Sequence, residues 1–125
     1  MPTPKEEALE TLKFLKTDFD AAVTDAQEDG RRWRVLRHYT DPKAREDEFV
    51  GYAQKAAAVA ELVGKEDKPA ATTELQGMKK VFDAIAADCR AQKVDILESF
   101  FGITAQEARM FEGYSTAVDK VMKLL

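Results

Sequence analysis

The chain has 125 residues and a mass of 14.0 kDa, which is enough for one hydrophobic core, so we predict a single domain over residues 1–125. With 45% hydrophobic and 34% charged residues, it is too apolar to be a disordered chain. The formal net charge of −4 disfavours nucleic acid as a partner. No apolar run approaches the roughly 18–20 residues that span a bilayer, so we expect no membrane insertion. A single cysteine, Cys89, excludes an internal disulfide.

Four stretches of the chain carry apolar residues at alternating spacings of three and four, which is the pattern of amphipathic helices. We expect these helices near residues 4–28, 42–63, 73–101 and 105–125. The four apolar stripes, in chain order, are Leu12, Leu15, Phe19, Ala22 and Ala26; Phe49, Tyr52, Ala56, Val59 and Val63; Leu75, Met78, Phe82, Ile85 and Cys89; and Phe111, Tyr114, Val118, Val121 and Leu125. No stretch alternates with a period of two residues, so we expect no sheet.

Capping signals precede each expected helix. Thr3 followed by Pro4 is a favoured start for the first helix, and Pro42 marks the start of the second. The other two starts are candidate capping boxes, Thr73 with Gln76 and Thr104 with Glu107. The clearest loop is residues 64–71. Because short connections favour antiparallel neighbours, we predict an all-α, up-down-up-down four-helix bundle.

A basic segment lies between the first two expected helices and contains four arginines, the only histidine and the only tryptophan. We expect it to form a short helical segment and to bind a partner through Arg31, Arg32, Trp33, Arg34, Arg37 and His38. The arginines could hold nucleic-acid phosphates, bind carboxylates of an acidic protein surface, or only solvate a segment whose tryptophan is core. The flanking carboxylates and the negative net charge favour the acidic protein surface over nucleic acid.

Three glycines, Gly51, Gly77 and Gly113, fall inside the expected helices, where each costs about 1 kcal/mol relative to alanine. They could admit a close partner helix or ligand. Alternatively, they could allow close packing within the bundle or be merely tolerated, and we favour this second interpretation.

The sequence carries no recognisable catalytic or metal-binding pattern. One histidine is too few for the paired Glu-x-x-His ligands of di-iron bundles, and one cysteine with one histidine is too few for a typical zinc site. No glycine-rich phosphate loop, nucleophile elbow or EF-hand loop occurs. The acidic run at residues 46–48 points in several directions on a helix and cannot converge on one cation. We therefore expect neither an enzyme nor a bound metal or organic cofactor.

The chain from Trp33 onward resembles the PsbQ-like extrinsic proteins of photosystem II, as a divergent red-lineage or diatom type. The resemblance rests on Trp33, then Arg37 four positions later, then Pro42 at the start of a long helix. Residues 111–125 are similar to the closing helix of that family, with a tyrosine, an alanine, an aspartate and a terminal aliphatic pair. The first helix and the dense arginine cluster have no counterpart in the family pattern.

The resemblance implies a non-catalytic extrinsic subunit that binds the lumenal side of photosystem II and supports oxygen evolution by helping to retain calcium and chloride. It implies the photosystem II core and other extrinsic subunits as partners. The mature protein would lie in the chloroplast thylakoid lumen after removal of a transit peptide, and we expect it to be monomeric when free. The alternative function is that of a cytoplasmic helical adaptor or chaperone, which binds an acidic protein partner through the arginine- and tryptophan-containing segment.

Overall fold

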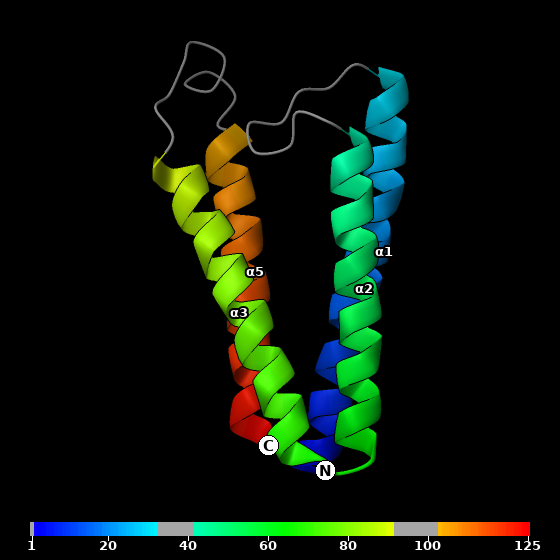
Figure 1. Cartoon of the computed structure of the whole chain (residues 1–125), viewed down its shortest axis with the longest axis vertical. Helices are drawn as coiled ribbons and strands as arrows, with labels where there is room; N and C mark the ends of the chain where they lie inside the picture. Colours follow the sequence, from blue (N-terminus) through cyan, green and yellow to red (C-terminus); the bar gives the residue numbers. More distant parts are fainter. Residues whose placement is uncertain (1, 33–41, 92–102) are drawn as a thin grey trace.

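The computed structural model describes residues 2–32, 42–91 and 103–125, with side chains described for residues 2–28, 46–91 and 108–125. The described chain is helical almost throughout and contains no strand, so the all-α prediction is confirmed. Its helices are α1 (Pro4–Arg32), α2 (Pro42–Gly64), α3 (Lys68–Ala91) and α5 (Ile103–Leu124). The helices alternate in direction, and both termini lie at the same end of the bundle (Figure 1).

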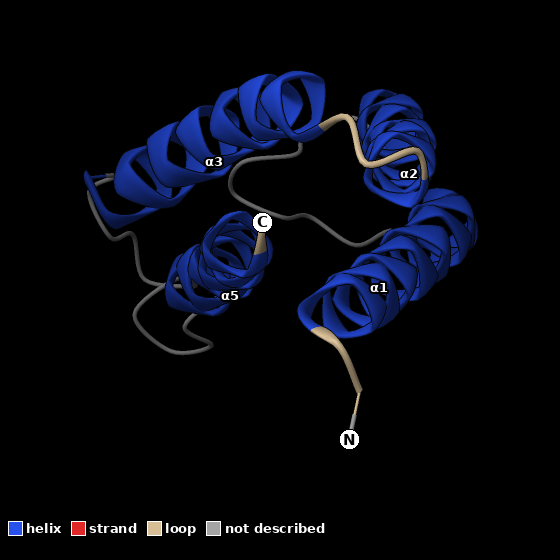
Figure 2. Cartoon of the chain, turned by 90° about the horizontal axis from the view of Figure 1, so that it is seen from below, coloured by secondary structure: helices blue, strands red, loops and turns tan. Residues whose placement is uncertain are grey.

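The bundle consists of two helical hairpins. Helices α1 and α2 form one hairpin and α3 and α5 the other, and the hairpins diverge toward the end opposite the termini (Figure 1). Seen along the bundle, the helices follow the order α1, α2, α3, α5 around the core, so α1 faces α5 and α2 faces α3 (Figure 2). The two hairpins must therefore be held together by contacts across these two seams.

The four predicted stripes face one another in the core. All their residues are buried except Tyr52 and Leu125, which are partly buried and pack against the core. At the centre, six aromatic rings have centroid separations of 4.9–6.3 Å. This aromatic layer is made of Phe19, Phe49, Tyr52, Phe82, Phe111 and Tyr114. Rings from all four helices meet here, so the aromatic layer joins the two hairpins.

The start of α1 agrees with its predicted cap. The Oγ1 atom of Thr3 accepts a hydrogen bond from the backbone N–H of Glu6 at 3.1 Å, and the N–H of Glu7 bonds the Thr3 carbonyl at 2.9 Å. Pro4 is the first helical residue, where its missing N–H leaves no intrahelical bond unmade.

The predicted start of α3 is wrong, because the helix begins at Lys68 rather than at Thr73. Asp67 is the actual cap, since its Oδ1 accepts a hydrogen bond from the N–H of Ala70 at 3.3 Å. Pro69 lies in the first turn, where proline is tolerated, so it does not delay the helix. Thr73 is instead inside the helix, and its hydroxyl donates to the carbonyl of Pro69 at 3.0 Å.

The other boundaries differ less from prediction. Helix α1 continues through Gly30 to Arg32, so the first two arginines of the basic segment extend the long first helix. Arginine is a strong helix former, which offsets the cost of the glycine. Helix α5 begins at Ile103, so Thr104 lies inside it rather than ahead of it. The predicted continuation of the third helix to residue 101 falls outside the described residues.

Candidate partner-binding site

The residues predicted to bind a partner cannot be placed as a site. Arg31 and Arg32 end α1, at the end of the bundle opposite the termini (Figure 1). Their side chains, together with the whole of Trp33, Arg34, Arg37 and His38, lie outside the described residues. Partner binding through this segment stays a prediction.

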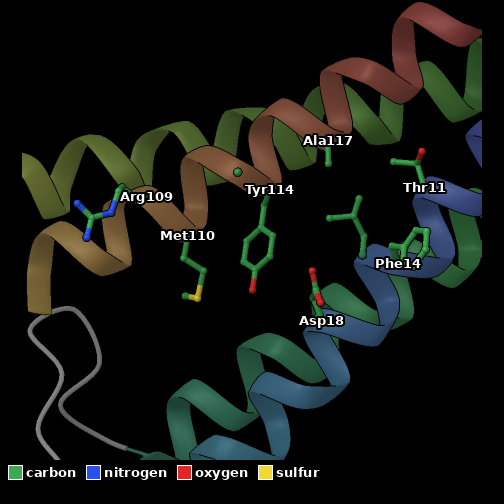
Figure 3. A pocket seen from close by; sticks show the side chains of 9 residues that line it. Thr11, Phe14, Asp18, Arg109, Met110, Tyr114 and Ala117 are labelled. Carbon is green, nitrogen blue, oxygen red and sulfur yellow. The ribbon is translucent and has the colours of Figure 1, made fainter.

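An open groove runs along the seam between α1 and α5 and is a candidate site among the described residues (Figure 3). Its volume is about 400 Å³. The residues that line it are Thr11, Phe14, Leu15, Asp18, Arg109, Met110, Gly113, Tyr114 and Ala117. We refer to it below as the α1/α5 groove.

Helical spacing explains why these residues share the groove. On each helix they recur every three or four positions, so they lie on one face. Leu15 and Tyr114 are buried beneath the groove, whereas Phe14 stands at its edge with 64% of its surface exposed. Neighbouring positions on a helix point about 100° apart, and here Leu15 takes the inward position while Phe14 points outward. Phe14 lies outside the predicted apolar stripe of its helix, but its exposure was not predicted from the sequence.

The glycines in the helices do not mediate close packing within the bundle. A Cβ atom added at Gly51, Gly77 or Gly113 would meet nothing within 4 Å, outside the backbone of its own helix turn. The part of our preferred interpretation that invoked close packing is therefore wrong for these three positions. Gly113 lines the α5 side of the α1/α5 groove, with open space where a Cβ would lie.

Charged residues lie in the α1/α5 groove and at the end of it nearer the termini. Toward the termini, Lys120 on α5 pairs with Glu7 on α1 at 3.4 Å and closes the seam. Asp18 and Arg109 lie on opposite walls (Figure 3). Within the described part of the chain, neither of these two makes a hydrogen bond or an ion pair, and both are exposed. The groove therefore presents two exposed charges of opposite sign beside an exposed aromatic ring, and the charge of Arg109 also attracts Glu112 on its own helix.

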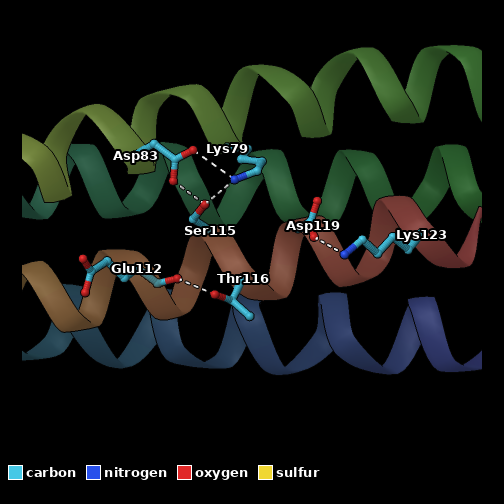
Figure 4. A network of polar contacts seen from close by, with 7 residues as sticks. All are labelled: Lys79, Asp83, Glu112, Ser115, Thr116, Asp119 and Lys123. Carbon is cyan, nitrogen blue, oxygen red and sulfur yellow. Dashed lines mark hydrogen bonds and ion pairs between the residues drawn. The ribbon is translucent and has the colours of Figure 1, made fainter.

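A polar cluster joins α3 to α5 on another face of the bundle (Figure 4). Ser115 is only 4% exposed, and its hydroxyl donates to Oδ1 of Asp83 at 2.5 Å. Lys79 donates to Oδ2 of Asp83 and to the Ser115 hydroxyl, each at 3.0 Å. Arg90 lies about two turns beyond Asp83 on α3, and Glu112 lies about one turn before Ser115 on α5. These two residues make a bidentate ion pair at 2.7 and 2.6 Å.

The hydrogen bonds among Lys79, Asp83 and Ser115 hold α3 against α5, and we call these three residues the clasp. The hydrogen bond from Ser115, followed by that from Lys79, holds the pKa of Asp83 below its usual value. Lys79 donates to both Asp83 and Ser115, so the three side chains hydrogen-bond one another across the two helices. Because the Ser115 hydroxyl both donates and accepts a hydrogen bond here, it stabilises the α3–α5 hairpin.

The lowered pKa of Asp83 leads to a pH-dependent prediction. Its stabilising contribution should be fully present above the ordinary aspartate pKa of about 4 and should be lost as pH falls through the lower folded-state pKa. We expect Asp83→Asn to cost no more than about 1 kcal/mol near neutral pH, because the side chain is half exposed. Urea unfolding at neutral and acid pH should show this difference shrinking in acid. Glu10→Gln, at an exposed position on α1, is the control, and a difference that does not vary with pH would contradict the prediction.

Two further features concern metals and membranes. Among the described residues, no three or more His, Cys, Asp or Glu side chains gather in a group that could hold a metal ion. In the same part of the chain, no helix is both long enough and apolar enough to cross a bilayer.

Comparison of the chain with protein-family models, with characterised proteins and with solved structures found no match. The groove, the clasp and the basic segment therefore have to be interpreted from their own residues.

Proposed function

We propose that this protein is a non-catalytic extrinsic subunit that binds the lumenal side of photosystem II and supports oxygen evolution there. The observation that carries the proposal is the sequence pattern of Trp33, Arg37 and Pro42 together with the closing segment 111–125. A four-helix bundle is the fold that the resemblance implies, and the chain has that fold. The proposed setting is the thylakoid lumen.

The closing segment supports the proposal through its place in the fold. It forms most of α5, where Phe111, Val118 and Val121 are fully buried against the other helices. Asp119, another residue of the resemblance, pairs with Lys123 one turn later at 2.9 Å. Phe111, Val118 and Val121 build the bundle and offer no surface to a partner, so we assign docking to photosystem II elsewhere.

We assign the docking role to the basic segment, Arg31 to His38. Several arginines on a chain of net charge −4 favour a partner surface rich in carboxylates, which arginine binds in a bidentate manner. Exposed ion pairs of this kind are screened over roughly 10 Å at 0.1 M salt, so binding should weaken as salt rises. Arg31 and Arg32 are placed at the end of α1, which favours docking by the end of the bundle opposite the termini.

The test is the triple variant Arg31→Glu, Arg32→Glu and Arg34→Glu. Rebinding to salt-washed photosystem II particles from a diatom or a red alga should weaken by at least about tenfold, because each charge reversal replaces attraction with repulsion. Oxygen evolution, measured with and without added calcium and chloride, gives the functional result. Circular dichroism should show an unchanged helix content.

A charge-matched control separates docking from a general change in charge. Lys13→Glu, Lys68→Glu and Lys80→Glu reverse three exposed lysines outside the basic segment, and this variant should rebind more tightly than the arginine variant. A folded arginine variant that rebinds like wild type would overturn the docking role of the segment. A wild-type protein that binds none of these particles would overturn the assignment to photosystem II and favour the cytoplasmic adaptor instead.

A further inference from the structure

We propose that the α1/α5 groove is the interface of a symmetric homodimer, in which Phe14 of each copy packs into the groove of the other. This goes beyond the proposed function and does not depend on it, because it concerns a different surface. It also replaces the sequence-based expectation that the free protein is monomeric.

The first step of the argument is the exposure of Phe14. It is the most exposed large hydrophobic residue of the described chain, at 64%, compared with 44% for Val81 and 37% for Val50. Fully burying a phenylalanine side chain contributes about 1.5–3 kcal/mol, so a surface that covers this ring gains substantially. Phe14 also adjoins the apolar side chains of the groove and is not an isolated surface residue.

The second step is that the same face carries a matching recess. On α5, Gly113 leaves an open position where a Cβ would meet nothing within 4 Å, and Ala117 follows one turn later on the same face. A two-fold interface uses one patch on both copies, so that patch must contain the protruding group and the recess that accepts it. The α1/α5 groove meets this requirement, because Phe14 of α1 and Gly113 of α5 both line it.

The third step is the charge on the two walls. Asp18 on α1 and Arg109 on α5 have opposite signs and make no ion pair or hydrogen bond within the described part of the chain, although Arg109 attracts Glu112 on its own helix. A two-fold axis along the groove places α1 of each copy against α5 of the other. The axis therefore brings Asp18 of each copy to the wall that carries Arg109 of the other copy. The interface contains two such pairs of opposite charge. This charge complementarity selects a second copy as the occupant, since one sequence supplies both charges and the apolar ring.

The test is a charge-swap experiment in solution. Sedimentation equilibrium over a wide range of protein concentration should show a monomer–dimer equilibrium for the wild-type chain. Asp18→Arg and Arg109→Asp should each raise the dimer dissociation constant by at least about tenfold, because each places two like-charged pairs in the interface. An equimolar mixture of the two variants should recover dimerisation, since every pair across the mixed interface is again of opposite charge. The double variant should also recover it.

A second pair of variants tests the apolar contact. Phe14→Ser should give a folded monomer, whereas Val81→Ser, at an exposed apolar position on α3, should leave the dimer intact. Circular dichroism should show unchanged helix content in every variant. A wild-type chain that stays monomeric at all concentrations would overturn the proposal. So would dimerisation that is insensitive to the single charge reversals, or single variants that fail to recover when mixed.

Discussion

Phe82→Ala should lower the free energy of unfolding by about 3–5 kcal/mol, the largest effect that we expect from a single truncation in this bundle. The side chain is completely buried. Its ring lies 5.9 Å from that of Phe19, and 5.1 Å from that of Tyr52, so it contacts both helices of the opposite hairpin. Removing it opens a cavity at the seam where the two hairpins meet, and closing that cavity would require the hairpins to move.

Urea unfolding followed by far-ultraviolet circular dichroism measures this loss. Val81→Ala is the matched control, because it truncates the neighbouring residue of α3, which is 44% exposed. We expect the control to change the free energy of unfolding by no more than about 0.5 kcal/mol. A Phe82→Ala variant as stable as the control would show that the aromatic layer is not the centre of the core.

The core residues could be predicted from the sequence because the pattern that identifies them, the spacing of apolar residues along each helix, is local. Spacings of three and four residues fix which side chains share a face, whatever the rest of the chain does. Leu12, Phe49 and Leu75 were therefore assigned correctly to the interior, although they lie on three different helices. The same argument gave four antiparallel helices, since four apolar faces can all be buried only against one another.

The start of α3 was harder to predict because the sequence offers two candidate caps. Asp67 and Thr73 are both residues that cap helices, and the prediction took Pro69 as part of a loop. Helix α3 begins earlier because Ala71 and Leu75 are already buried in its first two turns. Burial of Ala71 depends on the other helices, so the choice between the caps is made by tertiary packing.

The α1/α5 groove and the clasp are missing from the prediction for a related reason. Lys79 and Ser115 are separated by 36 positions in the chain, so their hydrogen bond follows only from the packing of α3 on α5. The opening between Phe14 and Gly113 depends on how far the two hairpins diverge, which no local pattern encodes. Neither the exposure of Phe14 nor the recess on the same face was predicted from the sequence.

The two proposed interfaces can operate together because they occupy different parts of the molecule. Asp18 lies in the groove, whereas Arg31 is near the end of α1, about 20 Å further along the helix at 1.5 Å per residue. A dimer formed through the groove would leave the ends of both bundles accessible. Two basic segments on one dimer would then strengthen binding to an acidic surface by avidity.

Gly51→Ala combined with Gly77→Ala should raise the free energy of unfolding by about 1.5–2 kcal/mol, because each glycine lies inside a helix at an exposed position. An added Cβ would meet nothing within 4 Å at either site, so no clash offsets the gain in helix propensity. Urea unfolding of the double variant measures the gain. Ala57→Gly, at an exposed interior position of α2, is the reverse control and should cost about 1 kcal/mol. If the control loses stability while the double variant gains none, the two glycines serve a purpose that the isolated bundle does not require, and close approach of a partner becomes the better explanation.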